Sequence, residues 1–372
     1  MSAESTSLNL LSVEQVVRER YSQASQKVEP ALCCAVTPSQ PELLKVLPPE
    51  IIERDYGCGD PAKYVTAGET VLDLGSGVGK ACYVAAQIVG AAGRVIGVDM
   101  NDDMLSVARK YQPEIAQKIG YSNVEFRRGR IQDLATDLDV LDAMLASTSV
   151  ANAADWMAFE ERRKLLAKSE PMIASESIDV TLSNCVLNLV AEAERVQLIA
   201  ELYRVLRPGG RAVISDIVSS KPVPEHLKNN AELWSGCISG AFEQRAFVKA
   251  FETAGFTAVE LLERQAQPWQ VVEGIEFRSV TIRAYRPKLT VATGEVAYVT
   301  YRGPWRSVMT DDMVLLSRGE PMLVHAEVAD RWMIGPLKQQ LIVERAFFGG
   351  PASQQSSATE EHGCCGEATK CC

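Results

Sequence analysis

Apolar residues follow two spacings along the centre of the chain. Short apolar runs occur in TVLDL from Thr70, in RVIGV from Arg94 and in VEF from Val124. Segments with helical spacing separate these runs, in VGKACYVAAQIVG and over 102–110. Strand alternating with helix predicts a parallel sheet that is covered by helices on both faces.

The same pattern continues after an interruption. Residues 132–177 contain two predicted helices, DLDVLDAMLA and WMAFEERRKLLAK, before the next strand, IDVTLSN. A helix over 192–206, a turn at RPGG and the strand RAVISDIV follow, and AGFTAVELLER and IEFRSVTIRAY predict a closing pair of strands.

The flanking segments suggest how the chain is divided. Residues 8–26 have helical spacing and precede a Pro-rich stretch, which we interpret as a cap outside the core. The end of the chain is polar and rich in small residues, which favours disorder. The predicted units are a cap over residues 1–60, a cofactor-binding domain over 61–285 that includes an insertion over 219–245, a small strand-rich domain over 286–348, and a flexible Cys-rich tail over 349–372.

Composition narrows the class of protein. The 372 residues are 47% hydrophobic and 23% charged, and no apolar run reaches the roughly 20 residues that span a bilayer. The N-terminus lacks the features of a secretory signal, so we expect a cytoplasmic protein that does not bind membranes. A net charge of −10 without a basic cluster disfavours nucleic acid and favours a small-molecule substrate.

A glycine-rich segment points to a nucleotide-like cofactor. The run from Asp73 to Gly79, DLGSGVG, lies between a predicted strand and a helix, where glycines let the backbone approach a ligand closely. Asp99 ends the second strand, where a carboxylate can bind ribose hydroxyls. A glycine turn required only by packing and a nicotinamide-binding domain are the alternatives.

The spacing D-x-G-x-G-x-G departs from the dinucleotide pattern and resembles the first motif of seven-stranded, Rossmann-like S-adenosylmethionine-dependent methyltransferases. The resemblance implies an α/β fold of that class, with helical insertions and a small strand-rich C-terminal region. It also implies that S-adenosyl-L-methionine contacts Tyr56, Asp73, Gly75, Ser76, Gly77, Gly79, Asp99, Met100, Ile131, Gln132 and Asn184.

The ten cysteines are many for a reducing compartment, where cysteines more often bind metals or act in catalysis than form structural disulfides. Cys185 follows the fourth predicted strand, at the sheet edge where ligands bind, and Cys58 and Cys237 lie on segments that can reach it. For any one of them, a buried apolar role is an equal alternative. Cys82 lies on a helix face, and we assign it that structural role.

Three motifs, YGCG, SNCVLNLV and SGCISGA, resemble the arsenite S-adenosylmethionine methyltransferases, and the likeness covers about residues 56–285. It implies that Cys58, Cys185 and Cys237 bind trivalent arsenic, As(III). Soft thiolates select such a thiophilic centre, and three of them leave its lone pair free to attack the sulfonium methyl group. No general base is needed, which suits a chain whose first histidine is His226.

The remaining cysteines form adjacent pairs. Cys33-Cys34 resembles the extra N-terminal cysteine that the family pairs with the thiol equivalent to Cys58 during turnover, which implies a thiol reductant such as glutathione or thioredoxin as co-substrate. The local sequence ALCCAV does not indicate which of the two matches, and a flexible pair that merely tolerates cysteine is an equal alternative. The terminal Cys364-Cys365 and Cys371-Cys372 either capture arsenic or belong to a dispensable tail. Methylation of another small apolar acceptor and non-enzymatic metalloid binding are the competing functions. The sequence leaves open the number of methyl groups, the use of Se, Te or Sb compounds, and the oligomeric state.

Overall fold

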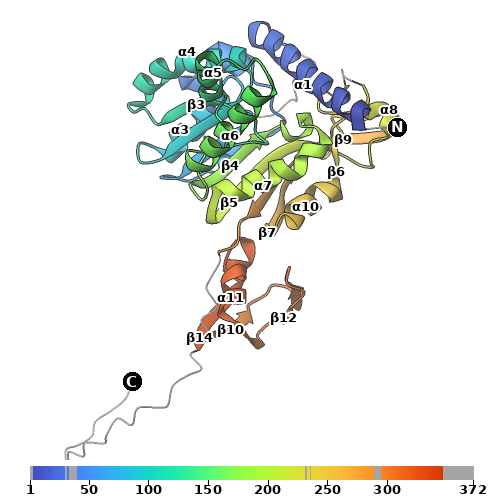
Figure 1. Cartoon of the computed structure of the whole chain (residues 1–372). Helices are drawn as coiled ribbons and strands as arrows, with labels where there is room; N and C mark the ends of the chain where they lie inside the picture. Colours follow the sequence, from blue (N-terminus) through green and yellow to red (C-terminus); the bar gives the residue numbers. More distant parts are fainter. Residues whose placement is uncertain are drawn as a thin grey trace, which may run out of the picture.

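The computed structural model describes residues 3–29, 32, 40–230, 233–234, 236–288 and 295–346. Its centre is a nine-stranded sheet in which seven strands follow the order β3-β2-β1-β4-β5-β9-β7, while β6 pairs with β5 and β8 with β9 (Figure 1). The strands of this sheet are β1 (Thr70–Leu74), β2 (Arg94–Asp99), β3 (Val124–Arg128), β4 (Ile178–Asn184), β5 (Leu206–Ser219), β6 (Phe242–Glu243), β7 (Thr257–Arg264), β8 (Gln270–Val272) and β9 (Ile275–Tyr285).

The sheet is parallel from β3 to β5, and β9 runs antiparallel to both β5 and β7. The chain moves outward from β1 through β2 to β3, then returns to the other side of β1 with β4. This reversal of strand order opens a crevice at the carboxyl ends of β1 and β4, where ligands bind in such sheets. The predicted fold class is confirmed.

Helices cover both faces of the sheet, as the periodicity predicts. Alternate residues of a strand point to opposite faces, so Val71 of β1 packs with one apolar core and Leu72 with the other. The first core includes side chains of α3 and α4, and the second includes side chains of α7 and α10. The helices of this part are α1 (Ala3–Gln26), α2 (Pro49–Glu53), α3 (Lys80–Val89), α4 (Asp102–Ile119), α5 (Leu138–Ser147), α6 (Ala153–Ser169), α7 (Arg195–Val205), α8 (Glu225–Lys228) and α10 (Gln244–Thr253).

The short 3-10 helices lie mostly in the connections: η2 (Pro41–Val46), η3 (Pro61–Tyr64), η4 (Leu187–Leu189) and η5 (Glu192–Glu194). The turn predicted at RPGG is instead a bulge inside β5. Ile178 of β4 pairs with Leu206, and Val180 then pairs with Arg211, so four residues of β5 lie opposite one of β4. Gly209, at a φ of +85°, supplies the left-handed conformation that such a bulge uses.

A smaller C-terminal unit has its own apolar core, which includes Val299, Tyr301 and Trp332. Its strands form a three-stranded sheet of order β13-β10-β14 and a hairpin of β11 and β12. Its elements are β10 (Val296–Tyr301), β11 (Ser307–Met309), β12 (Leu315–Ser317), β13 (Pro321–His325), α11 (Ala326–Trp332), η6 (Pro336–Gln340) and β14 (Leu341–Ala346).

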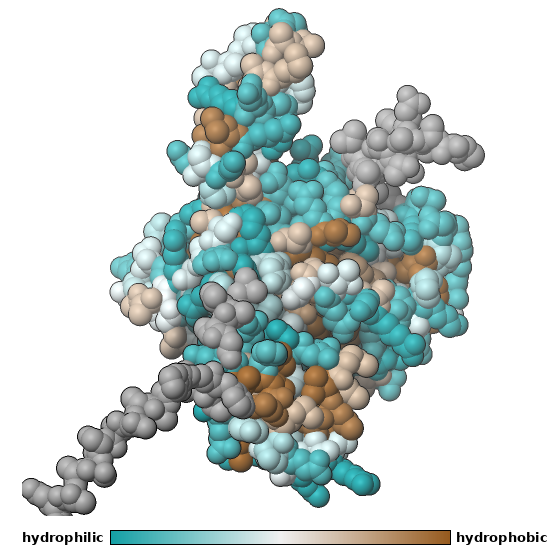
Figure 2. Space-filling model, turned by 60° about the horizontal axis from the view of Figure 1, so that its bottom comes forward, coloured by the Kyte–Doolittle hydropathy of each residue, from teal (hydrophilic) through white to brown (hydrophobic). Residues whose placement is uncertain are grey.

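Within the described part of the chain, no helix combines the length and the apolar character that a membrane crossing requires. The face shown in Figure 2 is mostly hydrophilic, and its apolar residues form separate groups rather than a continuous belt.

Candidate functional site

A cavity lies at the carboxyl ends of β1, β2 and β4, in the crevice that the strand order opens. Cys185, which follows β4, is part of its wall. Of the residues that the sequence assigns to the cofactor, those that line this cavity are Tyr56, Asp73, Gly75, Ser76, Gly77, Asp99, Met100, Ile131, Gln132 and Asn184. Gly79 does not line it.

The glycines between β1 and α3 have different roles. Gly75 has a φ of +69°, and a Cβ there would lie 2.4 Å from a methyl carbon of Val186, so the backbone fits tightly against the loop after β4. At Gly77 a Cβ would meet nothing within 4 Å, which fits a position facing a cavity. Gly79 is the N-cap of α3, and a Cβ there would lie 2.7 Å from the ring of Phe126. Its requirement for glycine therefore comes from packing and from its φ of +87° rather than from the cavity.

Two polar side chains in the cavity wall suit a nucleoside cofactor. The Asp99 carboxylate accepts hydrogen bonds from the backbone amides of Gly77 (2.8 Å) and Asn101 (2.9 Å), and its burial raises its pKa. The buried hydroxyl of Ser76 has no hydrogen-bond partner among the described residues. A polar ligand in the cavity would supply the hydrogen bond that the Ser76 hydroxyl lacks and could also bind the oriented carboxylate of Asp99.

The N-terminal helix α1 forms one side of the same cavity. Glu14, Val17, Arg18 and Tyr21 line it, and the amide of Asn101 donates a hydrogen bond to the carbonyl of Arg18 (3.1 Å). We predicted this helix as a cap outside the core, and its placement over the cavity was missed. Its apolar spacing indicates a helix but carries no motif that identifies a ligand.

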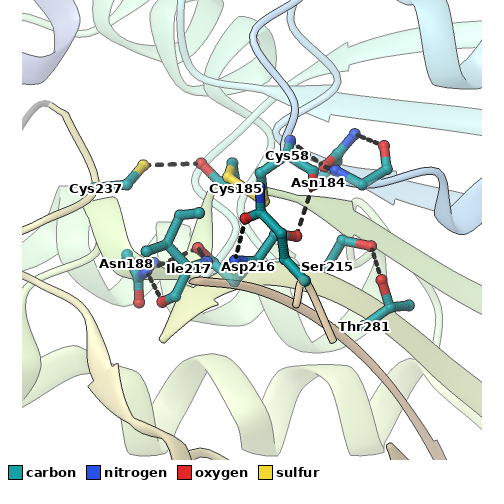
Figure 3. Close-up of a disulfide and its surroundings, with 12 residues drawn as sticks. Cys58, Asn184, Cys185, Asn188, Ser215, Asp216, Ile217, Cys237 and Thr281 are labelled. Carbon is teal, nitrogen blue, oxygen red and sulfur yellow. Dashed lines mark hydrogen bonds between the residues drawn. A yellow bond between two sulfur atoms is a disulfide. The ribbon is translucent and has the colours of Figure 1, made fainter. Parts of the chain in front are cut away.

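The three cysteines singled out in the sequence come together beside the cavity (Figure 3). Cys58 and Cys185 form a disulfide, and the thiol of Cys237 lies 3.4 Å from the carbonyl oxygen of Cys185. All three are at most 6% exposed and belong to an apolar cluster that includes Ile217 and Phe277. Such surroundings exclude water from the sulfur atoms.

The disulfide departs from the expected set of three free thiolates, because two of them are joined in this structure. They meet because Cys185 follows β4 directly and the loop of Cys58 is bound to the last residue of that strand. The other predicted redox and capture cysteines, which are Cys33, Cys34, Cys364, Cys365, Cys371 and Cys372, lie outside the described residues.

Asn184 holds the loop of Cys58 in place. Its side-chain oxygen accepts hydrogen bonds from the backbone amides of Cys58 (2.8 Å) and Gly59 (3.0 Å), and its amide group donates to the carbonyl of Gly59 (2.9 Å). Asn184 was predicted as a cofactor contact, and it lines the cavity as well. One side chain therefore links the cofactor cavity to the cysteine cluster.

Arg195, at the start of α7, holds the loops of Cys185 and Cys237 against each other. Its guanidinium donates to the carbonyl of Gly240 (2.6 Å) and to that of Val190 (3.1 Å), and burial lowers its pKa to about 10. The backbones meet so closely that a Cβ on Gly240 would lie 1.9 Å from the carbonyl oxygen of Asn188. The sequence analysis missed Arg195, since an arginine in a helix carries no motif.

The backbones of Cys185 and Cys237 both have a left-handed conformation, with φ of +63° and +61°. Residues other than glycine hold such conformations at a cost of about 1–3 kcal/mol each, and they persist where the surroundings fix them. The hydrogen bonds of Asn184 and Arg195 fix the loops that carry these residues. Strain of this kind is typical of functional sites.

Asp216, in β5, is the one acidic residue grouped with the disulfide among the described residues. Its carboxylate and the sulfur atoms of Cys58 and Cys185 all lie within 4.8 Å of one another. The side chain is fully buried, and this burial raises its pKa to about 7. No motif in the sequence identifies Asp216, which lies in a mostly apolar part of β5.

The chain is similar to known methyltransferases. A family model described as a methyltransferase domain matches residues 65–255. The arsenite methyltransferase of Aquipseudomonas alcaligenes is 35% identical over 247 residues, and that of Mus musculus is 31% identical over 301 residues. The crystal structure of an arsenic(III) S-adenosylmethionine methyltransferase from Chlamydomonas reinhardtii is 28% identical, with a TM-score of 0.56.

These matches cover different shares of each protein. The match to the Aquipseudomonas alcaligenes protein takes in 65% of this chain and 61% of that protein, so the chain spans less than two thirds of it. The match to the Mus musculus protein takes in 77% of this chain and 70% of that one. For the Chlamydomonas reinhardtii structure the shares are 83% and 96%.

Proposed function

Since the chain belongs to the arsenite methyltransferase family, we propose that it transfers methyl groups from S-adenosylmethionine to trivalent arsenic held by Cys58, Cys185 and Cys237. The observation that carries the proposal is the meeting of three cysteines, from segments far apart in the sequence, at the wall of the cavity. No common feature of the general methyltransferase fold calls for them.

The cavity has groups suited to each part of the cofactor. Asp99 offers its carboxylate to the ribose hydroxyls, Met100 and Ile131 offer apolar surface to the adenine, and the backbone around Gly77 offers room for the methionine portion. The unpaired Ser76 hydroxyl is available to the methionine carboxylate or amine. When bound, S-adenosylmethionine supplies an electrophilic methyl group on a sulfonium sulfur.

The cysteines account for the choice of substrate. Each thiol that replaces a hydroxyl group of arsenite forms an As–S bond and releases one water molecule. Three such exchanges give a neutral pyramidal centre, which suits an apolar, water-excluding cluster. The lone pair of arsenic remains free to form the As–C bond, while the electrons of the broken C–S bond stay with the departing sulfur. The chain orients the two partners and excludes water.

The disulfide supports a need for a thiol reductant. Cys58 and Cys185 can replace hydroxyl groups of arsenite only after two electrons and two protons have converted their disulfide to thiols. A dithiol such as reduced thioredoxin, or two molecules of glutathione, would supply them and become oxidised to a disulfide. We therefore place the activity in a reducing compartment such as the cytoplasm.

The test is methyl transfer from radiolabelled S-adenosylmethionine to arsenite, with and without a thiol reductant, followed by separation of volatile and soluble arsenic products. We expect labelled methylarsenicals that require both arsenite and the reductant. Cofactor binding without any arsenite-dependent transfer would contradict the proposal. It would favour another apolar acceptor or a non-enzymatic metalloid-binding role.

A further inference from the structure

The proposed reaction gives Asp216 no part, although this residue touches the same cluster. Three thiolates complete the coordination of trivalent arsenic without an oxygen ligand. Yet a carboxylate oxygen of Asp216 and the sulfur atoms of Cys58 and Cys185 all lie within 4.8 Å of one another, and all three residues are buried. A buried carboxylate next to thiolates would add negative charge to an apolar cluster.

The positive charge of Arg195 acts to lower the pKa of Asp216, but the two side chains form no salt bridge within the described residues. The oxygens of Asp216 accept hydrogen bonds from the side-chain amide of Asn188 (2.8 Å) and from the backbone amides of Ile217 (2.8 Å) and Asn188 (3.3 Å). All these donors are neutral, and no ion pair to Asp216 occurs within the described part of the chain. Buried carboxylates are usually paired with a cation or bound to a metal ion.

The donor set suits a divalent ion that accepts both sulfur and oxygen. With Zn–S bonds of about 2.3 Å and Zn–O bonds of about 2.0–2.2 Å, the ligand atoms of a tetrahedral site lie roughly 3.3–3.8 Å apart. The three ligand atoms lie within 4.8 Å of one another, so a modest movement that separates the two sulfur atoms after reduction would bring them into this range. Cys237, whose thiol lies 3.4 Å from the Cys185 carbonyl oxygen, borders this group but is not one of the three residues whose ligand atoms lie within 4.8 Å of one another (Figure 3).

We propose that, in the reduced protein, Cys58, Cys185 and Asp216 bind a divalent thiophilic cation of the Zn²⁺ class, which excludes arsenite from the site. This site rests on the proposed function, because it uses two of the same cysteines. Asp216 distinguishes the two sites, since it would bind Zn²⁺ and not arsenic. Zn²⁺ accepts a carboxylate oxygen readily, whereas trivalent arsenic is satisfied by sulfur. Since bound Zn²⁺ has no lone pair to attack a methyl group, it inhibits methylation competitively with arsenite.

The experiment is a Zn²⁺ titration of the full-length chain against a chromophoric chelator. Before the titration, a phosphine reduces the disulfide, and the phosphine is then removed under anaerobic conditions so that the thiols stay reduced. The six cysteines that could bind Zn²⁺ elsewhere are first replaced by Ser: Cys33, Cys34, Cys364, Cys365, Cys371 and Cys372. We expect one Zn²⁺ per chain in this background. Asp216→Asn weakens Zn²⁺ at least tenfold more than it weakens arsenite, and Cys185→Ser weakens both.

Cys82→Ser, which changes a buried thiol outside the cluster, is the matched control and keeps the affinity for Zn²⁺. X-ray absorption of Zn²⁺ bound to the protein with Asp216 intact provides a second measurement. It does not depend on whether the Asp216→Asn variant folds. We expect a mixed shell of sulfur and at least one oxygen near 2.0 Å. An all-sulfur shell, equal Zn²⁺ affinity in Asp216→Asn, or no stoichiometric Zn²⁺ would overturn the inference.

The inference and the proposed function can fail separately. Zn²⁺ binding without arsenite methylation would remove the proposed function and leave this metal site standing. Arsenite methylation that Zn²⁺ does not inhibit, with no bound Zn²⁺, would remove the metal site and leave the proposed function standing.

Discussion

The two halves of the candidate site are built in different ways. The cofactor half is centred on short, continuous segments at the ends of β1 and β2, where a backbone amide donates to Asp99, and α1 and the loops after β3 and β4 complete its wall. The cysteine half joins three loops whose cysteines are 127 and 52 residues apart along the chain. Two polar side chains, the half-buried Asn184 and the buried Arg195, hold those loops together.

The two halves should therefore respond differently to substitutions. Backbone at a strand end is fixed by the sheet itself, so changes of side chain there should remove single contacts and leave the shape intact. The cysteine half depends on side chains that bridge loops, so removing one bridge should disturb a thiol that is several residues away. Substitutions in the two halves test this contrast.

The largest effect should come from the sulfur atoms themselves. Cys185→Ser or Cys237→Ser replaces a soft ligand with a hard hydroxyl, and we expect arsenite methylation to fall more than hundredfold. S-adenosylmethionine affinity, measured by calorimetry, should stay within about threefold, because the cofactor half is fixed by the sheet. A parental rate of arsenite methylation in both variants would rule out the three-thiolate site.

Cys58→Ser sharpens this prediction. A methylated trivalent substrate already carries carbon in place of one ligand, so two thiols should suffice for it. We expect Cys58→Ser to retain activity on methylarsenite while losing activity on arsenite, as measured in parallel assays. Equal loss on both substrates would show that Cys58 has another role.

Asp99→Ala addresses the cofactor half. It removes charge-assisted hydrogen bonds to the ribose, each worth about 1.5–3 kcal/mol, and should weaken S-adenosylmethionine binding about ten- to hundredfold. Arsenite binding to the cofactor-free protein, followed by tryptophan fluorescence, should be unaltered. Loss of both affinities together would mean that the two halves are not independent.

Arg195→Met tests the bridge between loops. It leaves the carbonyls of Gly240 and Val190 without their donor, and we expect the KM for arsenite to rise about tenfold while cofactor affinity changes less than threefold. Arg204→Met, in the same helix, is the control, since Arg204 binds Glu201 and the Ile173 carbonyl away from the cysteines. An equal effect of both variants would show that Arg195 contributes to the overall stability of the protein and not specifically to the cysteine loops.

The smallest effect belongs to Cys82→Ser. Cys82 is fully buried on the inner face of α3, with its thiol 3.2 Å from the Asp73 carboxylate, and it belongs to a different apolar core from the three clustered cysteines. We expect a loss of about 1 kcal/mol in the free energy of unfolding, measured with urea, and unchanged methylation kinetics. A changed KM for arsenite would show that Cys82, on α3, also influences the arsenite site.

The sequence predicted the parts of the molecule whose signal is local. Strand and helix periodicity predicted the sheet and its two covered faces, and the residues picked out by the spacing of glycines with Asp99 line, apart from Gly79, one cavity. Gly79 was assigned to the cofactor because the pattern records a need for glycine and not its cause, which here is packing against Phe126.

The parts that were missed depend on contacts between distant segments. Arg195 and Asp216 act through loops that are adjacent only in the folded chain, so neither has a neighbour in the sequence that reveals its role. The disulfide between Cys58 and Cys185 has the same origin. Helix α1 was identified as a helix, but which surface it covers is decided by tertiary packing.

The left-handed backbone at Cys185 and Cys237 affects how this protein would respond to artificial selection. Glycine at either position relieves the strain, which offsets part of the packing lost with the side chain. A screen that rewards heat resistance alone therefore protects these two cysteines only weakly. Libraries built for heat resistance should therefore be screened with arsenite present. Only a requirement for sulfur ligands then selects for cysteine at both positions.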